Sequence, residues 1–107
     1  MTARSEQTYL VECFVPGSDR AAVEAAGQRM REAIADLRAE GCEVEYLRAI
    51  LVPGDEVVFH VFAAPDASAV REASRRADVD FERVVESVAF DAGDDARRPR
   101  ERTREGA

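Results

Sequence analysis

Four polar side chains stand singly within segments that are otherwise apolar, and their types suit a binding site. They are Glu12, Arg48, His60 and Glu86. Carboxylates and an imidazole can coordinate a divalent transition metal, whereas an arginine among carboxylates favours an ion-pair network or an anionic ligand. Tyr46 precedes Arg48 by two residues on the same expected strand face, so we predict that it lines the same site.

Two interpretations of this cluster remain open. In the structural one, Arg48 bridges the glutamates and the buried polar network fixes how two copies of the protein pack. In the functional one, the residues line a pocket for a metal or a small polar or anionic ligand, or His60 acts as a general base. We favour the structural interpretation, since ion-pair networks also perturb pKa values.

The composition excludes several classes of function. A chain of 107 residues forms one domain with a modest core. It has no lysine, which excludes a Schiff base, and its net charge of −7 argues against a nucleic-acid or anionic-membrane surface. No apolar run approaches the length of a membrane span, and residues 1–8 lack the apolar centre of a signal peptide, so we expect a cytoplasmic location.

Hydrophobic periodicity predicts the elements. Four strands are predicted over residues 8–15, 44–52, 57–63 and 83–90. A stripe of apolar residues predicts a helix over residues 20–40, and Asp66 is placed to cap a second, shorter helix. Gly27 lies on the stripe, where a close approach of the helix to the sheet would explain a residue that weakens a helix. We expect residues 1–7 to be flexible and residues 91–107 to form a disordered charged tail.

The order β-α-β-β-α-β predicts the α+β class and a ferredoxin-like sandwich. In this fold four antiparallel strands form one sheet and both helices cover one of its faces. The first and third strands are central, the fourth lies beside the first, and the second lies beside the third. Residues 8–90 are predicted to make up this domain.

Alternation along the strands assigns a face to each residue. The face expected under the helices carries Tyr9, Val11, Cys13, Leu47, Ala49, Phe59, Val61, Val85 and Ala89. The open face is expected to carry Leu10, Glu12, Phe14, Tyr46, Arg48, Ile50, Val58, His60, Phe62, Glu86, Val88 and Phe90. Because soluble monomers rarely expose so large an apolar surface, we predict a homodimer in which a second copy covers this face.

Several short segments resemble a known family. They are Tyr9-Leu10-Val11-Glu12, Val44-Glu45-Tyr46, the run from Phe59 to Pro65 and the run from Asp80 to Glu86. They resemble the small bacterial ferredoxin-like domains of unknown function that include an actinobacterial nickel-binding protein. The resemblance covers about residues 8–90, and it implies a dimeric α+β barrel and binding of nickel or another divalent transition metal.

The residues that carry the implied metal site differ here from many members of that family. Many members have a histidine where Arg48 stands and often a cysteine where His60 stands, whereas Glu12 matches the pattern. Arginine is not a metal ligand, but imidazole suits nickel. The resemblance therefore implies His60 and Glu12 as the metal ligands of this chain.

These observations predict a small homodimeric domain that binds a ligand or metal on its open sheet face, and they favour a protein that is not an enzyme. The alternative is a cofactor-free isomerase or monooxygenase-like enzyme of the dimeric α+β barrel type, with His60 as base and Arg48 holding an anionic substrate. Such an enzyme needs a cavity of roughly 300 Å³ beside His60. In a third interpretation the dimer itself is the whole role.

Overall fold

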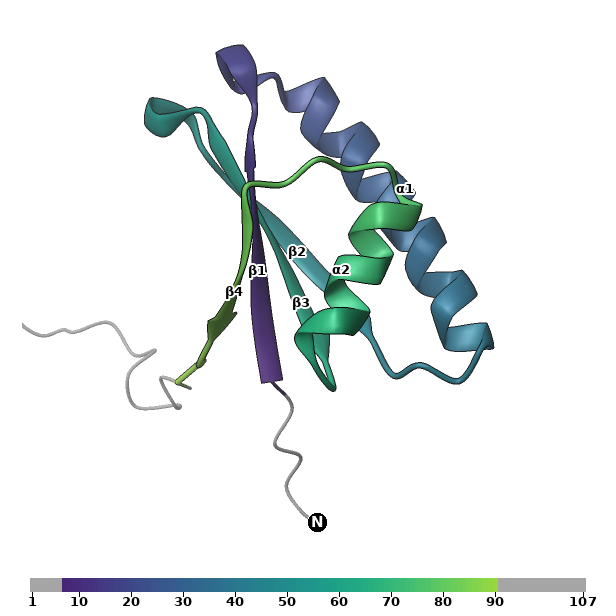
Figure 1. The fold of residues 1–107 in the computed structure, drawn as a ribbon. Coiled ribbons are helices and arrows are strands. Elements are labelled where there is room, and N and C mark those ends of the chain that lie inside the picture. Colours follow the sequence, from purple (N-terminus) through teal and green to yellow (C-terminus); the bar gives the residue numbers. More distant parts are fainter. Residues whose placement is uncertain (1–6, 91–107) are drawn as a thin grey trace, which may run out of the picture.

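Four strands form a single sheet in the computed structural model, which describes residues 7–90. The strands are β1 (Gln7–Phe14), β2 (Glu45–Val52), β3 (Val57–Ala64) and β4 (Arg83–Ser87). Their order in the sheet is β2-β3-β1-β4, and every neighbouring pair is antiparallel. Helices α1 (Arg20–Ala39) and α2 (Ala67–Arg76) lie on one side of this sheet (Figure 1). The predicted ferredoxin-like α+β fold is confirmed.

Both helices begin at an aspartate that caps them. Asp19 accepts hydrogen bonds from the backbone N–H groups of Ala21 and Ala22, at 3.0 and 3.3 Å. Asp66 accepts one from the backbone N–H of Ala69 at 3.0 Å, as the sequence predicted for this cap. The buried side of α1 consists of Gly27, Met30, Ala33, Ile34 and Leu37. Four of these residues, Met30, Ala33, Ile34 and Leu37, belong to the hydrophobic core, and α1 contacts chiefly α2 and β2.

The face of β1 was predicted correctly, but the face of β3 was not. Tyr9, Val11 and Cys13 are buried under the helices, as expected. Directly paired residues share a face, and His60 pairs with Val11 while Phe62 pairs with Tyr9. His60, Phe62 and Val58 therefore face the helices, whereas Phe59 and Val61 lie on the open side. Nearly every residue of β3 is apolar, so alternation carries no information about its direction, and a shift of one residue exchanges the two faces.

Some residues of β2 and β4 also lie on the face opposite to the one predicted. The register of β2 against β3 shifts between Tyr46 and Arg48, as in a β-bulge, and this puts Tyr46 on the helix side. In β4, Val84 pairs with Val11, so Val84 faces the helices and Val85 faces the open side. Two adjacent valines leave the alternation of β4 ambiguous, which accounts for the error.

The predicted ends of the domain are only partly covered by the described residues. Strand β4 ends at Ser87, three residues earlier than predicted, and Val88 and Phe90 follow it with 70% and 87% of their surfaces exposed. Residues 1–6 of the predicted flexible N-terminus (residues 1–7) and the predicted tail at 91–107 lie outside the described residues, whereas Gln7 begins β1. Phe81, in the connection between α2 and β4, packs against the core. No helix within residues 7–90 combines the length and apolar character needed to cross a bilayer.

Candidate functional site

His60 lies at the centre of the molecule, in the middle of β3. Its neighbours in the sheet are Val11 on β1 and Ala49 on β2. The imidazole is fully buried, with 0% of its surface exposed. Two neighbouring strands and a helix layer therefore enclose the only histidine of the chain.

Tyr46 of β2 is the hydrogen-bond partner of His60. The tyrosine hydroxyl lies 2.8 Å from Nδ1 of the imidazole. The phenol ring also packs edge-on against Phe62, with 5.2 Å between ring centroids, and the Arg31 guanidinium of α1 lies 5.5 Å from its centroid. A cation at this distance from an aromatic ring is attracted by the electrons of the ring face. Tyr46 is thus held between the sheet and α1.

Gly27 of α1 makes room for this tyrosine. A Cβ atom on Gly27 would lie 3.1 Å from the Tyr46 hydroxyl oxygen, closer than ordinary van der Waals contact. The predicted close approach of the helix to the sheet at Gly27 is confirmed. The sequence did not indicate that the group approached is the hydroxyl that binds His60.

Burial keeps both partners of this hydrogen bond neutral. It lowers the pKa of His60 to about 4 and raises the pKa of Tyr46, the latter against the opposing effect of Arg31. The phenol O–H is a stronger donor than a neutral imidazole N–H, so we assign the hydroxyl as donor to Nδ1. The ring proton of His60 is then on Nε2. That atom has no hydrogen-bond partner among residues 7–90.

Glu12 and Arg48 lie on the other face of the sheet. Glu12 accepts a hydrogen bond at 2.5 Å from Nε of Arg83, its direct partner on β4. Arg48 is exposed and pairs with Val61, which also places it on the open side. The ion pair between Glu12 and Arg83 was not predicted, although the expected neighbourhood of the first and fourth strands allowed a search for it.

The expected cluster of four polar residues is therefore not assembled within one chain. Glu86 pairs with Tyr9 on the helix side of β4 and is exposed. His60 is buried on the helix side, and Glu12 and Arg48 lie on the open side. The prediction that all four share one face was wrong because it assumed unbroken alternation through β2 and the opposite direction for β3 and β4.

Cys13 lies on the helix side, as predicted, and is a poor nucleophile. Burial raises the pKa of its thiol to about 11, and the carboxylates of Glu82 and Asp80 add to this increase. A thiol with such a pKa is protonated near neutral pH, and the thiolate is the reactive form. These properties are those of a small core residue.

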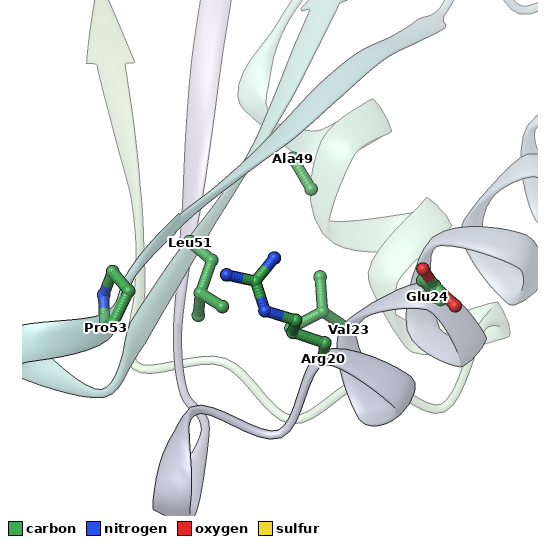
Figure 2. Close-up of a pocket in the computed structure, with 6 residues that line it drawn as sticks. All are labelled: Arg20, Val23, Glu24, Ala49, Leu51 and Pro53. Carbon is green, nitrogen blue, oxygen red and sulfur yellow. The ribbon is translucent and has the colours of Figure 1, made fainter.

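A groove lies between the start of α1 and the end of β2 (Figure 2). It has a volume of about 320 Å³ and is lined by Arg20, Val23, Glu24, Ala49, Leu51 and Pro53. Figure 2 shows the Arg20 side chain extending toward Leu51. Its two charged residues have opposite signs and are exposed, and none of its lining residues is buried. The groove therefore has no charge preference and no enclosed polar group to orient a ligand.

The potential metal donors of the described residues do not converge. Within residues 7–90, no group of three or more histidine, cysteine, aspartate and glutamate side chains is arranged to hold a metal ion. His60 and Glu12 lie on opposite faces of the sheet, so one ion cannot contact both within a chain. These residues of a single chain do not fit a nickel site.

The family comparison decides the relationship that the sequence suggested. A family described as nickel responsive protein SCO4226-like matches residues 9–86. The chain belongs to the SCO4226-like family. No curated protein and no solved structure shows significant similarity to it. The SCO4226-like match spans all four strands and both helices, and it confirms the resemblance seen in the sequence.

Proposed function

We propose that this SCO4226-like protein is a homodimeric metal-binding protein whose two copies pack through the open sheet faces. The open sheet face is the side of the sheet away from α1 and α2. Its apolar residues are Leu10, Phe14, Ile50, Val52, Phe59, Val61 and Val85. Phe14 and Ile50 are 55% and 46% exposed. The exposure of this face, on which each of these residues except the buried Val61 keeps accessible surface, is the single observation that carries the proposal, because soluble monomers rarely leave a large apolar surface open.

A second copy of the chain suits this surface better than an unrelated partner. Glu12 and Arg83 put charges of both signs on it, so a two-fold arrangement can match each charge with its opposite. Four strands of up to eight residues present roughly 500 Å² of flat area, near the lower limit for specific interfaces. The exposed Val88 and Phe90 follow β4 directly and can add apolar contact.

The proposed dimer also supplies metal donors that a single chain lacks. The family description supports nickel responsiveness, whereas one chain lacks a set of three donors among its described residues. Pairing the open faces brings Glu12 of each copy to the interface, where two carboxylates can contribute to one divalent site. Arg83 competes for the same carboxylate, so metal binding has to break the ion pair between Glu12 and Arg83.

The enzymatic alternative receives less support. The cavity beside His60 has a volume of about 230 Å³. This is smaller than the roughly 300 Å³ expected of a catalytic pocket. With a pKa of about 4, His60 is also a weak general base near neutral pH. Arg48 lies on the opposite face and cannot hold a substrate against His60 in the same chain.

Isothermal titration of nickel into the full chain tests the proposal. We expect saturable binding that is lost in Glu12→Gln and tightened in Arg83→Gln, because the second change removes the competing cation. Glu86→Gln is the matched control, since it removes a carboxylate from the helix side of β4 and should leave binding unchanged. Absence of nickel binding, or equal binding by Glu12→Gln, would contradict the proposal.

A further inference from the structure

We propose that the cavity between β1, β3 and α1 binds a small neutral organic molecule through the unpartnered Nε2 of His60. This site lies on the helix side of the sheet and is independent of the proposed dimer and its metal. The ligand is of single-ring size and carries one hydrogen-bond acceptor, such as a ketone or amide oxygen.

The cavity has the size and the walls of a small-molecule site. Its volume is about 230 Å³. An apolar cavity of about 150 Å³ is enough to hold benzene, and one water occupies about 30 Å³. Apolar residues form most of the wall, including Val15, Val23, Ala26, Val58 and Val79. A single ordered water would fill only a small part of this space.

The buried imidazole gives the cavity one polar contact. His60 lines the cavity, its surface is fully buried, and Nε2 has no hydrogen-bond partner among the described residues. Native proteins pair nearly all of their buried polar groups, so an unpaired buried ring nitrogen indicates a missing partner. Tyr46 holds Nδ1 and thereby fixes the ring. Because Nε2 carries the proton, the ligand atom that meets it is an acceptor.

The charges around the cavity favour a neutral ligand. Asp78 and Asp80 line it and disfavour an anion. Arg29 also lines it, but its Nε already donates a hydrogen bond to the carbonyl oxygen of Ala77 at 2.7 Å. The Cys13 thiol is protonated, so the cavity presents no thiolate nucleophile to the ligand.

The single histidine provides a direct readout in the full chain. With ¹⁵N-labelled histidine, all imidazole signals in an NMR spectrum come from His60. We expect acetophenone to shift the Nε2 resonance saturably, and ethylbenzene, which lacks the carbonyl, to bind at least tenfold more weakly. The carbonyl accounts for the difference because it alone can accept the Nε2 proton.

A pair of alanine variants tests the location. Ala26→Leu fills the cavity, whereas Ala25→Leu adds the same side chain at an adjacent exposed position that does not line it. Acetophenone binding should be lost in the first variant and kept in the second. Ala22→Leu, at another lining position, replaces Ala26→Leu if that protein does not fold. Equal binding of acetophenone and ethylbenzene, binding that survives both cavity-filling variants, or no shift at millimolar acetophenone would each overturn the proposal.

Discussion

The hydroxyl of Tyr46 lies 2.8 Å from Nδ1 of His60, and this contact joins β2 to β3 beneath α1. It depends on two features of the chain. A register shift after Tyr46 turns its side chain toward the helices, and Gly27 leaves space for the hydroxyl. The stability of the core around His60 is therefore linked to three separate elements.

Removing the hydroxyl should destabilise the protein. In Tyr46→Phe the buried Nδ1 of His60 loses its only hydrogen-bond partner within residues 7–90, and an unsatisfied buried polar group costs about 1–3 kcal/mol. Urea unfolding of the two proteins measures this difference. Tyr9→Phe, at a buried tyrosine of β1, is the control and should cost less. Equal effects of the two substitutions would show that the contact with His60 adds no stability.

The substitution Gly27→Ala should not stabilise this protein as glycine-to-alanine changes within helices usually do. Replacing glycine by alanine inside a helix normally stabilises a protein by about 1 kcal/mol. Here the new Cβ would lie 3.1 Å from the Tyr46 hydroxyl oxygen, and the resulting displacement offsets that gain. In the Tyr46→Phe background, where the hydroxyl is absent, Gly27→Ala should stabilise by about 1 kcal/mol. If Gly27→Ala stabilised the wild-type protein by the same amount, the close approach between position 27 and the Tyr46 hydroxyl would be contradicted.

Acid should destabilise the fold through His60. Its pKa is about 4 in the folded protein, against an ordinary value of 6.5. Above pH 6.5 the imidazole is neutral in both states and costs nothing. Between pH 6.5 and 4 the unfolded chain binds the proton more readily, so folding stability is lost progressively, up to about 3 kcal/mol at 1.36 kcal/mol per pKa unit.

Two measurements separate this effect from the titration of carboxylates. The imidazole resonances of the single histidine should titrate with a midpoint near pH 4. The difference in unfolding free energy between wild type and His60→Gln should also shrink as the pH falls from 7 to 4. A midpoint near 6.5 in the folded protein would show that the imidazole is open to water.

The sequence predicted the fold because local patterns and chain order agree. The stripe along α1, the cap at Asp66 and the order of the predicted elements each point to the same sandwich. Sequence patterns also predicted the buried side of β1, where Glu12 alternates with buried apolar residues. Each of these features depends on residues that are close together in the chain, so it can be recognised from a single sequence.

The candidate site could not be predicted to the same extent. His60 stands in a strand that is apolar on both faces, so alternation does not reveal which side it takes. The side of Tyr46 depends on one register shift, which no residue type near it requires. Each error placed a residue on the wrong face of the sheet, and the error in β3 put His60 on the same face as Glu12. Their correction revealed the pairing of Tyr46 with His60.

The oligomeric state of the full chain tests the proposed function most directly. We predict that light scattering after size exclusion gives twice the chain mass of 11.8 kDa for wild type. Ile50→Glu, on the open sheet face, should give a folded monomer, because it puts a charge into the proposed interface. Phe14→Glu serves as a second interface variant, and Ala25→Glu, on the exposed side of α1, should remain a dimer. A monomeric wild type, or dimers in both interface variants, would contradict pairing through the open sheet face.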